Sequence, residues 1–120
     1  GCIEWEYVAG GGTLRVRHVN SGFNCCILGV TADVAADRDT ILIHEFEQLD
    51  DGGCKCLCLY DLEFSAAVID PGAYVMRVSG PYMAPWQPDS GESADIIFTC
   101  NLTDDSSGTY CVSREHYPWN

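Results

Sequence analysis

The sequence predicts an all-β protein, a single domain over residues 1–120 built as an antiparallel β-sandwich of about seven to eight strands and stapled by disulfide bonds. Apolar and polar residues alternate over most of the chain, which is the period of half-buried strands. Twelve glycines and five prolines divide the chain into short runs. Eight cysteines, an even number, are typical of an exported domain linked by disulfides.

Four strands are expected in the first half of the chain, over residues 3–8, 13–19, 25–34 and 40–47, and each is flanked by turn residues. In the second strand Leu14, Val16 and His18 share one face, and a turn is expected at residues 20–22. In the fourth strand His44 and Glu45 face opposite sides, so we expect a strand histidine and a surface acid rather than an acid–base pair.

Four further strands are expected in the second half, over residues 54–69, 70–78, 94–102 and 109–114. The first exceeds an ordinary strand and should bend near Asp61 or Ser65. Three prolines exclude residues 80–94 from a central strand and predict a surface loop. The last two strands should form a hairpin that ends the fold.

The sequence around the corner at Asp70 resembles motifs of known folds. Asp70-x-Gly72-x-Tyr74-x-Met76 resembles the corner of immunoglobulin-like domains, and Pro71-Gly72-x-Tyr74 resembles the strand entry of transthyretin-like and carboxypeptidase-regulatory-like sandwiches. Three other segments look similar to small uncharacterised exported proteins and lipoproteins of bacteria: Asn24-Cys25-Cys26, residues 54–64 and Tyr117-Pro118-Trp119. These resemblances imply a sandwich and an envelope location, and they supply no catalytic residue.

Cys54, Cys56 and Cys58 recur at every second position, so one strand face would carry three sulfurs. Such neighbours lie about 6.6–6.8 Å apart at the backbone, the outer limit for a disulfide, so their partners should come from other strands. A turn centred between Asp105 and Ser106 would place Cys100 opposite Cys111, and we expect that pair. The remaining partners of the row are, in an order left open, Cys2, Cys25 and Cys26.

A soft-metal site is the alternative use of these sulfurs, because thiolates favour copper(I) or zinc. Its ligands would come from one set of residues: Cys25, Cys26, Cys54, Cys56, Cys58 and His18. The spacing of one residue between cysteines differs from that of ordinary zinc knuckles, so we expect disulfides and no cofactor. These disulfides, rather than metal coordination, should lock the two layers of the sandwich together.

A formal net charge of −12 disfavours nucleic acids as partners. We find no catalytic motif, and Asp61 and Glu63 are better read as solvated strand residues than as a carboxylate pair. The chain is therefore not expected to be an enzyme. A protein or glycan partner would meet the aromatic side chains of the proline-rich loop, Tyr82 and Trp86.

The expected location is extracellular or in a bacterial cell envelope, periplasmic or as a surface lipoprotein. No apolar run is long enough for a membrane span. Gly1-Cys2 resembles the start of a mature lipoprotein, which makes Cys2 a candidate lipid anchor. The sequence thus predicts a non-catalytic binding, adhesion or assembly domain, with the soft-metal protein as the alternative.

Overall fold

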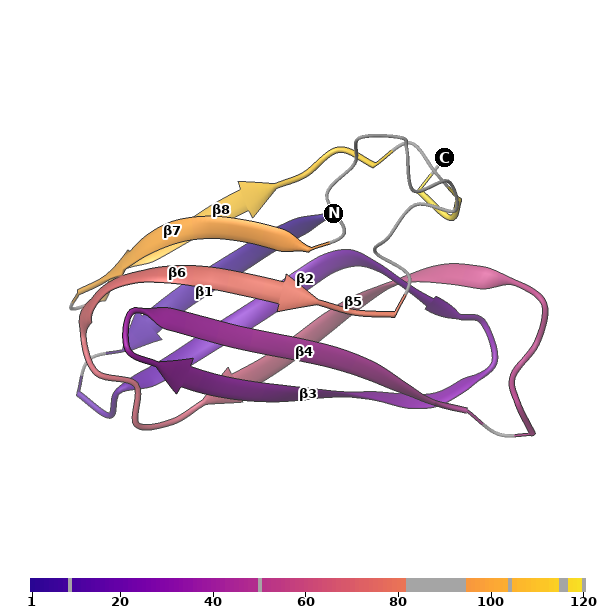
Figure 1. Ribbon diagram of the computed structural model, residues 1–120, viewed down its shortest axis with the longest axis horizontal. Helices are drawn as coiled ribbons and strands as arrows, with labels where there is room; N and C mark the ends of the chain where they lie inside the picture. The colour runs from indigo at the N-terminus through magenta and orange to yellow at the C-terminus, as the bar shows by residue number, and fades with distance from the viewer. Residues whose placement is uncertain (9, 50, 82–94, 104, 115–116, 120) are drawn as a thin grey trace.

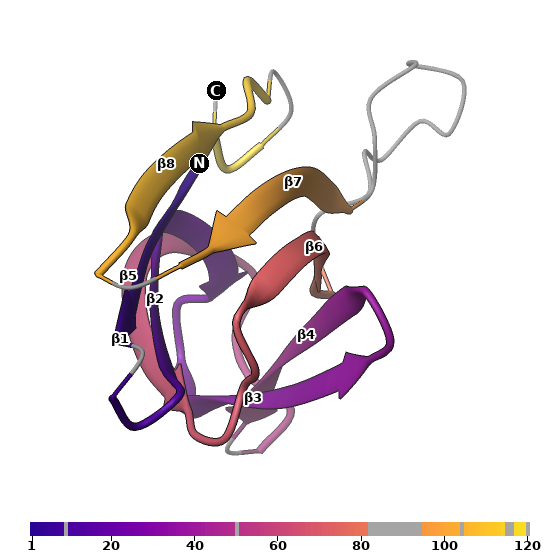
Figure 2. The ribbon, with the colours of Figure 1, turned by 90° about the vertical axis from the view of Figure 1, so that its left-hand side faces the viewer.

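The computed structural model describes residues 1–8, 10–49, 51–81, 95–103, 105–114 and 117–119. All of its regular elements are strands, and their order along the chain is β1 (Cys2–Val8), β2 (Thr13–Asn24), β3 (Ile27–Asp37), β4 (Thr40–Leu49), β5 (Leu57–Ala66), β6 (Gly72–Ser79), β7 (Ile96–Leu102) and β8 (Ser107–Cys111). They form two four-stranded sheets, β5-β2-β1-β8 and β3-β4-β6-β7 (Figure 1). The end-on view separates the two layers (Figure 2). The predicted all-β sandwich is confirmed.

One strand pair departs from the antiparallel prediction. β4 and β6 run parallel, with Thr40 opposite Val75 and His44 opposite Ser79, whereas the other pairings are antiparallel. The parallel pair is allowed because β5, which lies between them in sequence, belongs to the other sheet and carries the chain back. The second sheet is therefore mixed.

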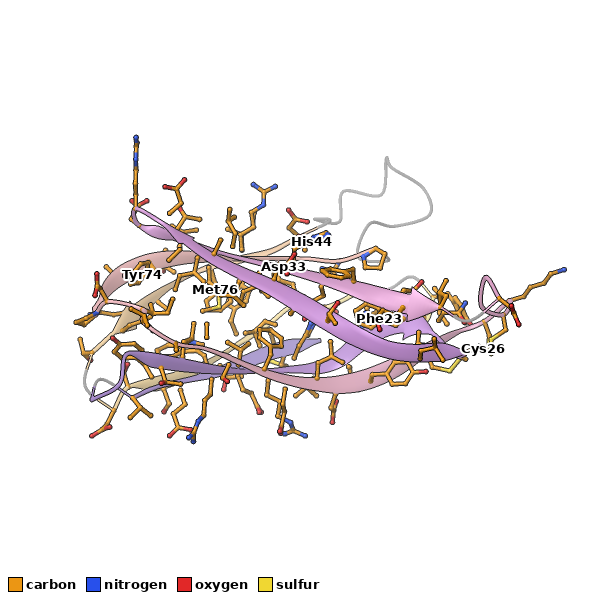
Figure 3. All side chains as sticks on the ribbon, turned by 90° about the horizontal axis from the view of Figure 1, so that it is seen from below. Phe23, Cys26, Asp33, His44, Tyr74 and Met76 are labelled. Carbon is orange, nitrogen blue, oxygen red and sulfur yellow. A yellow bond between two sulfur atoms is a disulfide. The ribbon has the colours of Figure 1, made fainter. Side chains whose placement is uncertain are left out.

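Alternating apolar side chains from both sheets fill the space between the layers. Figure 3 shows Met76 between the sheets, with Tyr74 near one end of the molecule and Cys26 at the other. The Tyr74 hydroxyl donates to the Asp70 carbonyl over 2.7 Å, which is the contact expected of a tyrosine corner. This contact is local, and the immunoglobulin-like or transthyretin-like type stays a prediction.

The predicted turn at residues 20–22 is wrong. β2 continues to Asn24, and the register against β5 shifts between His18 and Ser21, which marks a bulge with Asn20 at a φ of 58°. Residues three apart normally face opposite sides of a sheet, but the extra residue turns both His18 and Ser21 inward, where they are 2% and 1% exposed. The chain reverses instead at Cys25 and Cys26.

The predicted final hairpin is also wrong. β7 lies at the edge of one sheet and β8 at the edge of the other, so the connection between them crosses between layers. Cys100 and Cys111 therefore do not pair. Cys111 bonds to Cys2, its directly opposite residue on β1, while Cys100 is a buried free thiol. The Cys2 sulfur is thereby engaged, which contradicts its assignment as the attachment point of a lipid.

Candidate functional site

The other cysteines gather at one end of the sandwich, where β2 turns into β3 and the chain enters β5. Cys25 bonds to Cys58, and Cys26 bonds to Cys54. Two members of the predicted row thus pair with two of the three predicted partners. The third predicted partner, Cys2, bonds to Cys111 instead, and Cys56 is left as a partly exposed free thiol. We call these five residues the sulfur cluster. Figure 3 shows Cys26 and neighbouring sulfurs at this end.

Asn24 organises the sulfur cluster. Its side-chain oxygen accepts hydrogen bonds from the backbone amides of Cys26, at 2.8 Å, and Cys54, at 3.1 Å. Its amide group donates to the Cys54 carbonyl over 2.6 Å. The first contact closes an Asx turn, which is how an asparagine side chain reverses a chain without a regular turn. Adjacent Cys25 and Cys26 can therefore reach Cys58 at the start of β5 and Cys54 in the segment that precedes it.

Gly53 makes this close approach feasible. Its φ is 81°, and a Cβ atom built there would lie 3.0 Å from Asn24 side-chain atoms. A left-handed backbone conformation without a side chain is what glycine provides at low cost. The Asp51-Gly52-Gly53 turn, which the sequence marks clearly, thus brings the cysteine row against the turn between β2 and β3.

The Cys56 thiol lies among the sulfurs of both disulfides. Its Sγ atom is 3.7 Å from Cys54 Sγ, and the sulfurs of Cys25, Cys56 and Cys58 all lie within 4.8 Å of one another. This is the arrangement of a nucleophile beside two disulfide bonds. Sequence spacing predicted a shared sulfur face, but only the fold shows which cysteine has no partner.

His18 does not belong to this cluster. Its Nδ1 atom lies 2.8 and 2.9 Å from the two carboxylate oxygens of Glu45, and the Ser21 hydroxyl donates to the same carboxylate over 3.2 Å. His18 and Glu45 are 2% and 0% exposed. The expectation that Glu45 is a surface acid is wrong, because the alternation that buries Ile41 and Ile43 also buries Glu45.

The buried network of His18, Ser21 and Glu45 connects the layers, since β2 belongs to one sheet and β4 to the other. The three disulfides do not make that connection. Cys2–Cys111 ties two strands of the same sheet, whereas Cys25–Cys58 and Cys26–Cys54 tie the turn between β2 and β3 to β5 and to the segment before it. No disulfide therefore joins a strand of one sheet to a strand of the other, and the expectation that disulfides lock the two layers together stays a prediction. The sequence did contain a signal for this network, because His18 on β2 and Glu45 on β4 each fall on the alternating positions that apolar residues occupy in the same strand.

Asp61 and Glu63 lie on the outer face of β5 beside Arg17. The Arg17 guanidinium approaches Asp61 at 3.1 Å and Glu63 at 3.7 Å, and it also reaches Glu4 at 3.5 Å. Glu4, Arg17 and Glu63 border an open groove of about 770 Å³ across the outer face of the first sheet. The Asp61 and Glu63 side chains are 47% and 79% exposed. They form a solvated ion-pair network of little energetic weight, as expected from the sequence.

A serine, a histidine and an aspartate align on the outer face of the second sheet. His44 Nδ1 lies 2.9 Å from Ser79 Oγ, and Asp33 is opposite His44 on β3. Among the described contacts the aspartate makes no hydrogen bond to His44. A hydrolytic triad needs that bond to orient the imidazole, so the row does not qualify as one.

Cys100 is the second free thiol, and it is 7% exposed on the inner face of β7. Desolvation by burial raises the pKa of its thiol. Because the thiolate is the reactive form, Cys100 should be inert in the folded protein. The predicted contact residues Tyr82 and Trp86 lie outside the described residues.

Comparison of the chain with protein-family models, with curated proteins and with solved structures returned no match. None of the described residues belongs to a helix long and apolar enough to cross a bilayer. The assignment of the candidate site therefore depends on the geometry of its residues alone.

Proposed function

We propose that the protein is an exported, non-catalytic β-sandwich that acts in binding or assembly in the cell envelope or extracellular space, and that it joins a partner protein at the sulfur-cluster end. The three disulfides support an oxidising compartment, because such bonds rarely persist in a reducing cytosol. The net charge of −12 supports a protein partner over a nucleic acid.

The unpaired, partly exposed Cys56 carries this proposal. Six of the eight cysteines are paired and Cys100 is buried, so Cys56 is the one accessible thiol. A cysteine left over in an exported domain indicates an intermolecular disulfide or a reactive thiol. A disulfide to a partner cysteine requires a thiol that is both unpaired and accessible, and Cys56 is both.

Exposed apolar side chains surround the same end of the molecule. Leu59 adjoins Cys58, the Tyr117 hydroxyl bonds the backbone of Leu57, and Leu49 pairs with Ile27 at the start of β3. Four large apolar residues near the cluster are substantially exposed: Leu28 at 69%, Leu49 at 37%, Leu59 at 40% and Tyr117 at 57%. Such side chains supply the apolar contact area that a specific protein interface requires.

Acid trapping of thiols in cells that export the protein, followed by non-reducing electrophoresis, tests this proposal. The wild type is expected to give a reducible adduct of higher mass, which Cys56→Ser abolishes and Cys100→Ala retains. On the purified protein, a polyethylene glycol maleimide should label Cys56 in the native state and Cys100 only after denaturation. An adduct that persists in Cys56→Ser, or eight alkylatable cysteines in the unreduced denatured protein, would contradict the proposal.

The second candidate function is soft-metal binding, and the sulfurs of Cys25, Cys56 and Cys58 favour it. Thiolates at about 2.3 Å from a tetrahedral ion lie about 3.8 Å apart, which these sulfurs could reach by small movements once the Cys25–Cys58 bond is reduced. His18 would not contribute, because it is bound to Glu45.

Anaerobic titration of the fully reduced protein with copper(I), against a chromophoric competitor, measures this capacity. If the three cysteines bind metal, the protein should bind one equivalent of copper(I) tightly. Cys56→Ser should lower that affinity by at least about tenfold, since one of three thiolates is lost. Cys26→Ser, which alters a sulfur outside the trio, is the matched control and should leave that affinity unchanged. Equal affinities of the two variants would exclude the trio as the site.

A further inference from the structure

Cys25 has two cysteines within reach, Cys56 in the segment before β5 and Cys58 at the start of that strand. Phe23 is opposite Cys58 and Asn24 is opposite Leu57 in the antiparallel ladder of β2 and β5. One further step places Cys25 opposite Cys56, and the Cys25 amide indeed donates to the Cys56 carbonyl over 3.1 Å. The observed disulfide joins Cys25 to Cys58, with Cα atoms 5.0 Å apart, while Cys56, whose carbonyl accepts the Cys25 amide, keeps a free thiol.

We infer that Cys56 and Cys58 alternate as the disulfide partner of Cys25, so that the sulfur cluster is an internal thiol–disulfide exchange centre. The Cys56 thiolate attacks Cys25 Sγ, a Cys25–Cys56 bond forms, and the Cys25–Cys58 bond breaks. Cys58 leaves as a thiolate and takes a proton from water. The step needs no oxidant or reductant, because one disulfide and one thiol are present before and after it.

Within the Cys25–Cys58 disulfide, the geometry supports attack at Cys25 over attack at Cys58. The sulfurs of Cys25, Cys56 and Cys58 already lie within 4.8 Å of one another. Attack at Cys58 would join cysteines separated by one residue where the chain enters β5, and an extended backbone holds such residues at the outer limit of disulfide reach. Directly opposite residues of an antiparallel ladder lie about 4.5–5.5 Å apart at Cα, well within that reach.

Exchange changes what the end of the sandwich presents to solvent. In one form the thiol is on Cys56, in the segment before β5, and in the other it is on Cys58, within that strand. This inference concerns the same cluster as the proposed function, but it applies to the isolated monomer whether or not Cys56 joins a partner.

Native alkylation of the oxidised monomer followed by peptide mapping tests the exchange. The protein is incubated at mildly alkaline pH, its free thiol is then alkylated rapidly, and the reaction is quenched. The amounts of label on Cys56 and on Cys58 should be within about tenfold of each other, because one disulfide replaces another of the same kind. Acid quenching before incubation gives the starting distribution, and Cys100→Ala should exchange like the wild type. Label on Cys56 alone after prolonged incubation, or on Cys25 or Cys26, would overturn the inference.

Single substitutions give an independent readout. In Cys58→Ser the inference predicts a Cys25–Cys56 disulfide, so neither residue reacts under native conditions. In the matched variant Cys25→Ser, Cys56 and Cys58 should both react. If Cys25 and Cys56 both react in a folded Cys58→Ser protein, the inference is wrong. Should that variant fail to fold, the wild-type label distribution decides the matter, and it does so independently of any partner adduct.

Discussion

Replacing His18 with alanine is expected to lower the free energy of unfolding by about 3–5 kcal/mol, because it leaves the Glu45 carboxylate buried without its main partner. Glu45 is 0% exposed, so water cannot replace the lost contact without opening the sandwich. The truncation also leaves a cavity between the layers. Urea denaturation of the oxidised protein, followed by far-ultraviolet circular dichroism, measures the loss.

Two variants separate this effect from a general intolerance to substitution. His44→Ala removes an exposed histidine from the same β4 strand that carries Glu45, and it should change stability by about 0.5 kcal/mol or less. His18→Leu combined with Glu45→Leu removes both polar partners, so it should be more stable than His18→Ala. A loss below about 1 kcal/mol for His18→Ala would show that the network contributes no more than an ordinary hydrogen bond.

Removing the Cys2–Cys111 disulfide, as Cys2→Ser with Cys111→Ser, should cost about 2–5 kcal/mol of stability. The bond joins residues 109 positions apart and ties β8 to the edge of its sheet, so its loss frees the unfolded chain and loosens the last strand. The expected outcome is a lower denaturation midpoint under non-reducing conditions.

The Cys26–Cys54 bond provides the matched comparison, since it joins residues only 28 positions apart. Loop-closure entropy predicts that Cys26→Ser with Cys54→Ser costs about 1 kcal/mol less than removal of the longer-range bond. Wild-type midpoints for both double variants would mean that the staples do not stabilise the fold.

Local pattern was sufficient to place most of the strands. Alternation identified the inward face of β2, including the position of His18, and it grouped Glu45 with Ile41 and Ile43 on one face of β4, because a two-residue period fixes sidedness wherever the strand is regular. It did not show that this face of β4 is buried as far as Glu45, which was predicted to be a surface acid. It failed at the bulge in β2, where Asn20-Ser21-Gly22 has the composition of a turn but the strand continues. A bulge and a turn use the same residues, and only pairing with β5 distinguishes them.

For the cysteines too, the local pattern predicted part of the arrangement and long-range strand pairing decided the rest. Their number and the every-second-residue row predicted an oxidised, clustered arrangement, and the pairing of Cys54 and Cys58 with the adjacent cysteines agrees with it. The Cys100–Cys111 pair was predicted from the length of a supposed hairpin. It failed because β7 and β8 belong to different sheets, and sheet membership depends on long-range contacts that no short segment encodes.

The amino-acid sequence by itself determined the all-β class, the acidic surface, the main turns and the spacing of three sulfurs on one segment. Each of these follows from the conformational preference or chemistry of neighbouring residues. Only the tertiary structure decided the parallel pairing of β4 and β6, the burial of Glu45 against His18, and the identity of Cys56 as the accessible thiol. These depend on which distant strands meet, because a disulfide or a buried ion pair forms only between groups that the whole fold brings into contact.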